Sequence, residues 1–259
     1  MNTLLRALMA LLCLPALPLA AVSAPSIRLA SDNWCPYICA QDSTITGGFL
    51  VELTGQIVSA AGYRLESLLM PLNRAMTLAE ERDIDGVYAA PIDDRLLLSR
   101  PLAFSRACFY TLQHSTWRYT GQASLRAVPL GVIADYGYDG GAFDAYLQAR
   151  RHAAASLLDF NRGQNAGETN LNKLLTGRYP VAVEHEAVMR HLVLSQKVPP
   201  ERVRNAGCLE GRLKLVIGIG KNNPRARQLI GAIDDGMGKI RASGQLDHLR
   251  KKYHLDPSP

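Results

Sequence analysis

The sequence lacks the features that mark several common functional classes. Its 29 Lys and Arg residues outnumber its 23 Asp and Glu residues, but they are not gathered in a run, which argues against nucleic-acid binding. No apolar stretch beyond residue 24 is long enough to span a bilayer. The six histidines form neither an H-x₃-H nor an H-E-x-x-H pattern, so we expect no metal site. With 47% apolar and 20% charged residues, the composition is that of a folded globular protein.

Motifs of nucleotide binding and of nucleophilic catalysis are also missing. The segment 218–221 reads Gly-Ile-Gly-Lys, but a phosphate-binding loop requires G-x-x-x-x-G-K-[ST], and Asn222 follows the lysine. The sequence contains neither a nucleophile elbow nor a Ser-His-Asp order. We therefore expect a protein that is not an enzyme and that uses no cofactor.

Residues 1–24 have the pattern of a secretory signal peptide. Arg6 precedes an apolar stretch over 7–22, which two prolines interrupt, and the small residues Ser23 and Ala24 follow. The alternative is a membrane anchor, but this stretch is short for a bilayer core of about 30 Å. We therefore expect the mature chain to begin near residue 25 in an oxidising compartment.

Four cysteines remain after the signal peptide: Cys35, Cys39, Cys108 and Cys208. An even number in an oxidising compartment favours disulfides, and three pairings are possible. Cys35 and Cys39 are close enough to pair locally, which would leave Cys108 to pair with Cys208. The C-x₃-C spacing differs from the C-x₂-C that is typical of a redox pair or a zinc site.

Alternating strands and helices are predicted in two successive sets. The apolar residues Phe49, Leu53 and Ile57 recur at helical spacing, and Gly62 is typical of a residue that ends a helix. The first set has strands over 27–30, 63–69 and 84–90, a loop over 31–48, and helices over 49–61 and 71–82. The second has strands over 130–134, 157–160 and 181–184, and helices over 143–151, 169–175 and 185–195. A strand over 213–219 and helices over 224–241 and 245–253 follow. This order favours an α/β fold of two lobes, whose ligands bind beyond the carboxyl ends of the strands.

Three stretches of the sequence resemble the bacterial solute-binding proteins of family 3. They are Gly47-Gly48-Phe49 to Leu53, the run from Ile84-Asp85-Gly86 through Asp94-Arg95 to Pro101-Leu102-Ala103-Phe104-Ser105, and Gly244-Gln245-Leu246 to Lys252-Tyr253. Proteins of this family are periplasmic receptors that deliver amino acids and related polar solutes to ABC transporters. The resemblance covers essentially the whole chain after the signal peptide.

The resemblance implies a two-lobe, venus-flytrap architecture with two mixed, mostly parallel sheets flanked by helices and joined by two hinge strands. Lobe 1 would comprise residues 25–110 and 214–259, and lobe 2 residues 111–213. The hinge crossings would lie near 109–114 and 208–215. A Cys108–Cys208 bridge would then tie the two hinge strands together and still permit rotation.

The resemblance also implies ligand-binding residues in lobe 1. In the family, the arginine before Pro-Leu-Ala-Phe-Ser binds the carboxylate of the ligand, and Arg95 occupies this place; the alternative is a salt bridge to Asp93 or Asp94. The other candidates are Trp34 and Tyr37 as an aromatic cover, Arg74 as a second anion donor, and Tyr88 at a strand end. Each has an alternative. Trp34 and Tyr37 could instead pack beside a disulfide, Arg74 could be solvated, and Tyr88 could belong to the core.

Lobe 2 departs from the amino-acid-binding pattern of the family. Asp135, Tyr136 and Tyr138 stand where relatives carry a Gly-Thr-Thr turn, and they offer one charge and two phenols, unless they form only a solvated turn. The aspartate that binds a ligand ammonium falls on His185, and a slip of one residue would give this role to Glu184. An ordinary α-amino acid is therefore a doubtful ligand.

These observations favour a non-enzymatic periplasmic receptor that closes on a small polar, carboxylate-bearing solute. The expected partners are that solute and an ABC permease, and we expect a monomer that binds no nucleic acid. One alternative is an enzyme on the same scaffold, a dehydratase of cyclic carboxylates, in which Glu184, His185 and Glu186 face Arg95. The other is a sensor that docks on a membrane receptor.

Overall fold

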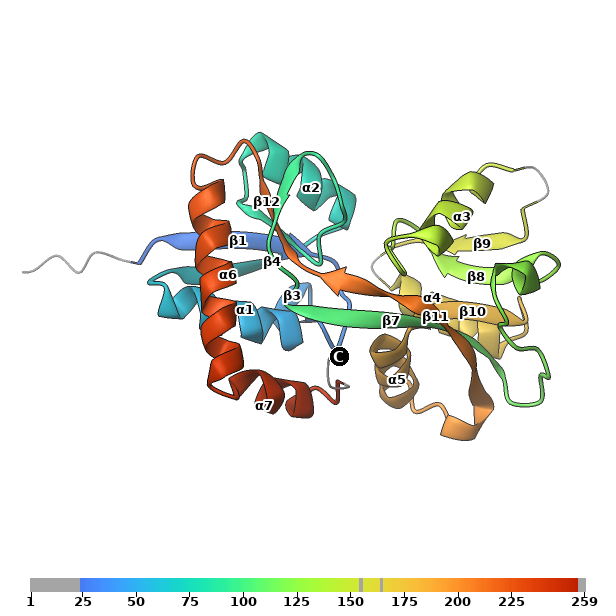
Figure 1. Ribbon diagram of the computed structural model, residues 1–259. Coiled ribbons are helices and arrows are strands. Elements are labelled where there is room, and N and C mark those ends of the chain that lie inside the picture. The colour runs from blue at the N-terminus through green and yellow to red at the C-terminus, as the bar shows by residue number, and fades with distance from the viewer. Residues whose placement is uncertain (1–23, 154–155, 164, 256–259) are drawn as a thin grey trace, which may run out of the picture.

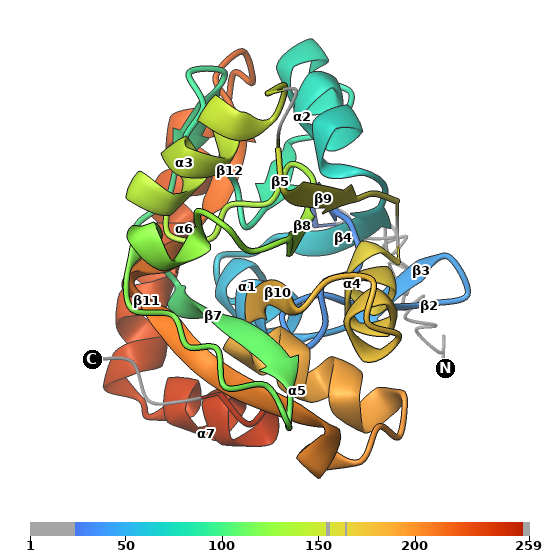
Figure 2. The ribbon, with the colours of Figure 1, turned by 90° about the vertical axis from the view of Figure 1, so that its right-hand side faces the viewer.

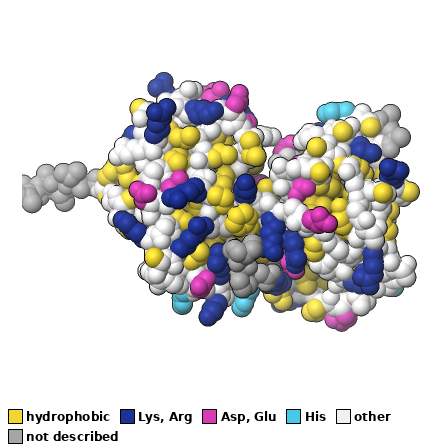
Figure 3. All heavy atoms as spheres, viewed as in Figure 1, with side chains coloured by type: hydrophobic (Ala, Val, Ile, Leu, Met, Phe, Trp, Pro, Cys, Tyr) yellow, Lys and Arg dark blue, Asp and Glu magenta, His cyan; other side chains and the backbone are white. Residues whose placement is uncertain are grey.

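The computed structural model describes residues 24–153, 156–163 and 165–255. Except for Ala24, the predicted signal peptide lies outside these residues. Two lobes are linked by two long strands (Figure 1), and a waist separates the lobes on the molecular surface (Figure 3). In the described part of the chain, no helix is both long and apolar enough to cross a membrane.

The first lobe is built on a five-stranded sheet in the order β4-β1-β5-β12-β6. Successive side chains of a strand point to opposite faces, so Ile27 and Leu29 of β1 pack with α1 and α6, while Ala30 packs with α2. The strands are β1 (Ser26–Ser31), β4 (Arg64–Leu69), β5 (Gly86–Tyr88), β6 (Leu96–Leu98) and β12 (Ile217–Gly220). The helices are α1 (Phe49–Ala60), α2 (Leu72–Glu81), α6 (Ala226–Ala242) and α7 (Gln245–Lys252).

The second lobe has a sheet in the order β11-β7-β10-β8-β9. Val181 and Val183 of β10 pack toward α3, while Ala182 packs toward α4 and α5, so helices cover both faces (Figure 2). The strands are β7 (Ala103–Leu112), β8 (Leu130–Ile133), β9 (Leu158–Asn161), β10 (Val181–His185) and β11 (Val203–Leu215). The helices are α3 (Ala142–Arg150), α4 (Ala166–Leu175) and α5 (Glu186–Ser195), with short 3₁₀ turns at Gln122–Leu125 and Pro200–Arg202.

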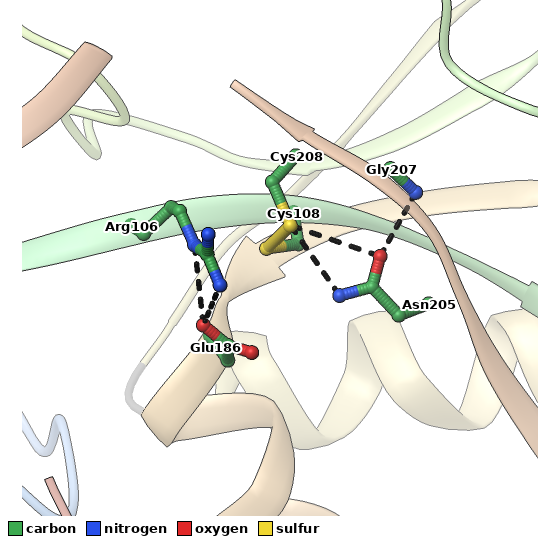
Figure 4. The surroundings of a disulfide bond; sticks show 6 residues. All are labelled: Arg106, Cys108, Glu186, Asn205, Gly207 and Cys208. Carbon is green, nitrogen blue, oxygen red and sulfur yellow. Dashed lines mark hydrogen bonds and ion pairs between the residues drawn. A yellow bond between two sulfur atoms is a disulfide. The ribbon is translucent and has the colours of Figure 1, made fainter. Parts of the chain in front are cut away.

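Strands β7 and β11 form the connection between the lobes. They pair antiparallel from Leu112 with Val203, inside the second lobe, to Ala103 with Leu215, beside the first lobe. Disulfides join Cys35 to Cys39 and Cys108 to Cys208, which confirms the favoured pairing. The second disulfide links β7 directly to β11 (Figure 4).

The structure corrects the sequence prediction in three details. The predicted loop over 31–48 contains a hairpin of β2 (Cys39–Gln41) and β3 (Thr44–Gly47). Strand β6 was not predicted, and the strand predicted over 213–219 is the end of β11 followed by β12. In each of the two five-stranded sheets one strand, β12 or β7, runs antiparallel to both of its neighbours, and the other four strands run in the same direction. Both sheets are therefore mixed with mostly parallel strands, as expected.

Candidate functional site

Two adjoining cavities, of about 130 and 60 Å³, lie between the lobes. They meet at Asp32 and Leu72 of the first lobe and at Asp135 and Tyr136 of the second. Asp32 follows β1, and Asp135 follows β8, so the cavities lie beyond the carboxyl ends of these strands, as the sequence predicts. The other residues of the larger cavity are Pro71, Asn73, Ile133, Ala134, Arg162, Gly163 and Ala166. Those of the smaller one are Ser31, Trp34, Tyr88, Ala89, Ala90, Pro91, Gly137 and Leu213.

Asp32 is the acid of the first lobe that faces both cavities. Its Oδ1 accepts a long hydrogen bond of 3.4 Å from the hydroxyl of Ser31, and within the described residues it makes no ion pair. Burial raises the pKa of Asp32 to about 6, although hydrogen bonds from its own backbone and from Ser31 act in the opposite direction. At neutral pH the cleft therefore contains a carboxylate that is paired with no cation of the described residues.

Aromatic rings from the two lobes meet beside Asp32. The ring of Trp34 lies 4.7 Å from that of Tyr37 and 6.0 Å from that of Tyr136, between ring centroids. It also lies edge-on to the imidazole of His185 at 5.0 Å. Trp34 and Tyr136 thus form a wall of the cleft with faces that attract a cation.

A polar contact between residues of the larger cavity joins the two lobes. Asn73 Nδ2 donates to Asp135 Oδ2 at 3.2 Å, and Arg151 Nη2 holds Asp135 Oδ1 at 2.7 Å. Asp135 has a φ of +66° and Ala89, which lines the smaller cavity, has a φ of +45°. Non-glycine residues rarely adopt this conformation, and such strain is concentrated at functional sites.

We expect Asn73→Ala to open the unliganded protein. The substitution removes one hydrogen bond between the lobes, worth about 1 kcal/mol, which corresponds to roughly a fivefold shift toward the open form. Small-angle X-ray scattering should show an increased radius of gyration. Thr77→Ala, on the same helix but outside the cavities, should leave the radius unchanged. An unchanged radius in both variants would show that this hydrogen bond does not hold the lobes together.

Arg95 lies outside the cleft, which corrects its expected position. Its Nε and Nη2 donate to the two carboxylate oxygens of Asp93 at 2.9 Å, and Nη1 lies 3.5 Å from Glu80, at the end of α2. The next residue, Leu96, pairs with Gly220 at the edge of the sheet away from the cavities. The salt bridge that the sequence analysis gave as the alternative is therefore present, and we assign no ligand carboxylate to Arg95.

The remaining candidates of the sequence analysis divide between the cleft and the core. Tyr88 lines the smaller cavity, and its hydroxyl lies 2.7 Å from Ser67 Oγ. Tyr37 and Tyr138 are buried; the first donates to Ser105 Oγ at 2.9 Å, and the second accepts from the backbone N–H of Ile133 at 2.8 Å. Arg74 is exposed on α2 and is not among the residues of either cavity.

Glu184 and His185 lie behind the cleft, fully buried, and line neither cavity. Glu184 Oε1 accepts from the backbone N–H of His185 at 2.8 Å, and burial raises the pKa of Glu184 to about 8, with a smaller contribution from Asp32. His185 Nε2 donates to the backbone carbonyl of Gly137 at 2.9 Å. Burial lowers the pKa of His185 to about 4, although this hydrogen bond acts in the opposite direction. Both side chains are therefore mostly neutral at pH 7.

Three cavity residues with a charged or amide side chain received no role in the sequence analysis. Asp32 lies two residues after the strand predicted over 27–30, which was the available signal for a position in the cleft. Asn73 lies in the first turn of a predicted helix, and Arg162 lies in the loop after β9. Neither position differs in sequence from an ordinary surface residue, so only the packing of the two lobes reveals them.

The fold is shared with known structures, while sequence comparison alone finds nothing. No protein-family profile and no curated protein matches the chain. A histidine kinase sensor domain with similarity to periplasmic binding proteins has a TM-score of 0.75 and 16% identity over 91% of this chain and 99% of its own. An ancestral arginine-binding protein bound to arginine has a TM-score of 0.71 and 16% identity over 89% and 99%.

A third similar structure is an amino acid ABC transporter substrate-binding protein from Streptococcus pneumoniae bound to L-arginine. Its TM-score is 0.67, with 16% identity over 88% of this chain and 94% of that one. Together these likenesses confirm that the chain has the two-lobe fold of periplasmic binding proteins.

Proposed function

We propose that this chain is a periplasmic solute-binding protein that closes its two lobes around a small solute bearing a positively charged nitrogen. The observation that carries the proposal is Asp32, a carboxylate in the cleft that is paired with no cation among the described residues. An ammonium or guanidinium group would neutralise it with a charge-assisted hydrogen bond. Trp34 and Tyr136 beside it suit the same charge through their ring faces.

The proposed solute also has a place for a negative group. Arg162 lines the larger cavity from the second lobe, on the loop between β9 and α4. A solute that spans from Asp32 to Arg162 would contact both lobes, and only contacts that the open form lacks can drive closure. We therefore propose that Arg162, rather than Arg95, faces a carboxylate when the solute has one.

The test compares four solutes of similar size by their effect on the melting temperature. L-arginine has a cationic side chain and a carboxylate, agmatine lacks the carboxylate, citrulline lacks the side-chain charge, and glutarate is an anion without any charged nitrogen. A ligand that binds only the native state raises its stability. We expect arginine and agmatine to raise the melting temperature and glutarate to leave it unchanged. A response to glutarate alone would overturn the proposal. A response to arginine but not to agmatine would assign the decisive contact to the carboxylate.

We propose delivery to an ABC permease as the role of the closed form, in a protein that acts as a monomer. One of the similar structures is the substrate-binding protein of such a transporter. Another is a sensor domain, which supports docking on a membrane receptor as a second candidate. Adjacent permease and ATPase genes would favour transport.

Catalysis in the cleft is not part of the proposal. The cluster at 184–186 would have to present an acid or a base to the solute, but Glu184 and His185 are buried outside both cavities. His185 Nε2 is already bonded to Gly137. Glu186 is paired with Arg106 at 2.8 Å rather than facing Arg95.

A further inference from the structure

The pairing of the two hinge strands is interrupted around the Cys108–Cys208 disulfide. Register shifts flank Cys208 on both sides, one toward Asn205 and the other toward Arg212. Between these two shifts, the only residues that pair across the strands are Cys208 and Cys108. Both strands lie wholly within the described residues. The covalent bond therefore joins β7 to β11 where their hydrogen-bond ladder is irregular.

The two cysteines of this disulfide differ in their exposure to solvent. Cys108 is fully buried, while Cys208 is partly exposed and lines a groove of about 530 Å³ on the second lobe. The amide nitrogen of Asn205 lies 3.3 Å from Cys208 Sγ and can donate to it (Figure 4). A molecule in the groove can thus reach Cys208 without entering the core.

Acidic side chains give the groove its charge. Asp139 and Glu210 line it together with Tyr119. The pKa of the Tyr119 hydroxyl is raised by burial first, and then by the negative charges of Asp139 and Glu210. A small molecule with a positive charge is therefore attracted to the groove.

We propose that Cys208 is a site of reversible thiol–disulfide exchange with small cationic thiols that enter this groove. The thiolate of the small molecule attacks Cys208 Sγ, a mixed disulfide forms there, and the Cys108–Cys208 bond breaks. The electron pair leaves with Cys108, which takes up the proton that the incoming thiol released. A second thiol can then attack the sulfur of the bound molecule, which yields its oxidised dimer and the Cys208 thiolate beside the Asn205 amide.

The exchange would loosen the hinge without separating the lobes. The regular pairs at both ends of the ladder remain, as does the ion pair between Arg106 of β7 and Glu186 of α5. The residues between Asn205 and Arg212 would lose their covalent attachment to β7. This inference does not depend on which solute the cleft binds.

The first experiment locates the adduct. Native protein is treated with cysteamine, quenched with acid, unfolded and alkylated, and its cysteine peptides are quantified by mass spectrometry. We expect cysteamine on Cys208 and alkylation on Cys108, with at least a tenfold excess over the reverse labelling. The proposal would be overturned if cysteamine labelled mainly Cys108. It would also be overturned if Cys108–Cys208 stayed closed while Cys35–Cys39 opened.

The second experiment tests the groove as the route of entry. Cysteamine should react several times faster than the anionic 2-mercaptoethanesulfonate at equal thiolate concentration, and Glu210→Gln should reduce this ratio. Thr120→Trp, inside the groove, should slow the reaction, while Thr116→Trp, on the same loop but outside it, should not. Equal effects of the two tryptophans, or equal rates of the two thiols, would contradict entry through the groove.

The third experiment measures the hinge by hydrogen exchange on wild-type protein before and after cysteamine treatment. Amides over 203–215 and 103–112 should exchange faster after treatment, and the melting temperature should fall by roughly 5–15 °C. A Cys35→Ser/Cys39→Ser variant should retain slow exchange in both hinge strands. Unchanged exchange in treated protein would show that the disulfide does not stiffen the hinge.

Discussion

Asp32→Asn is expected to weaken the binding of agmatine or arginine by about 10- to 100-fold. The substitution keeps the size of the side chain and removes the negative charge that the proposed function assigns to the solute. A hydrogen bond to a charged group contributes about 1.5–3 kcal/mol, which sets this range. Isothermal titration calorimetry at pH 7.5 measures the difference. The cleft position of Asp32 between the two cavities makes this the largest expected effect on binding.

The matched control for this variant is Asp94→Asn. Asp94 is an exposed acid that lines neither cavity, so its substitution removes the same charge from the surface of the protein. Wild-type affinity is expected in that control. Equal losses in the two variants would assign the effect to net charge, and an unchanged affinity in Asp32→Asn would refute a contact between Asp32 and the solute.

The same contact predicts a pH dependence. Burial raises the pKa of Asp32 to about 6, so the free protein loses the carboxylate as the pH falls through that value. Affinity for agmatine should therefore be about tenfold lower at pH 5 than at pH 8. In Asp32→Asn the affinity should be independent of pH over this range, which separates the effect from the titration of other groups.

Elements with a local periodic pattern could be predicted from the sequence, and the hairpin β2–β3 shows where this fails. Helix α1 was predicted because its apolar residues recur on one face and Gly62 follows them. In the structure Gly62 has a φ of +81°, which suits glycine. The hairpin turn instead uses Asp42 and Ser43, with φ values of +49° and +61°. Glycine and asparagine are the usual signals of such a turn, so this pair gives a weak one.

The candidate site was harder to predict because its geometry depends on distant pairings. The sequence analysis expected Arg95 to bind the ligand by its place in a motif, but its Nε and Nη2 donate to the carboxylate of Asp93, two residues earlier. Asn73 meets Asp135 only because the hinge brings α2 against the end of β8. The disulfides were predictable because the cysteine count leaves few pairings, and the shortest one can form locally.

Glu184→Gln is expected to stabilise the protein, and the gain in stability should grow as the pH rises from 5 to 8. Glu184 is fully buried, its Oε2 has no hydrogen-bond partner among the described residues, and burial raises its pKa to about 8. A glutamate carboxyl of the unfolded chain has a pKa near its ordinary value of 4.5. The folded state therefore binds the proton more tightly, and this favourable contribution is complete below about pH 4.5 and is lost as the pH rises toward 8.

Glutamine has the shape of the protonated acid and stays neutral, so the variant escapes this loss. The test compares the melting temperatures of both proteins at pH 5, 6.5 and 8. At pH 8 the variant should melt several degrees higher than wild type, which corresponds to a free energy of unfolding larger by on the order of a few kcal/mol. His185 has a lowered pKa, so it makes the folded state less stable as the pH falls below 6.5. Both proteins retain His185, so this effect cancels in the difference between them. Glu186→Gln, which removes the neighbouring acid that is paired with Arg106, should show a difference that does not grow with pH. The opposite result would be a Glu184→Gln variant that is less stable than wild type by the same amount at all three pH values. It would mean that Glu184 is a well-bonded carboxylate in the native state.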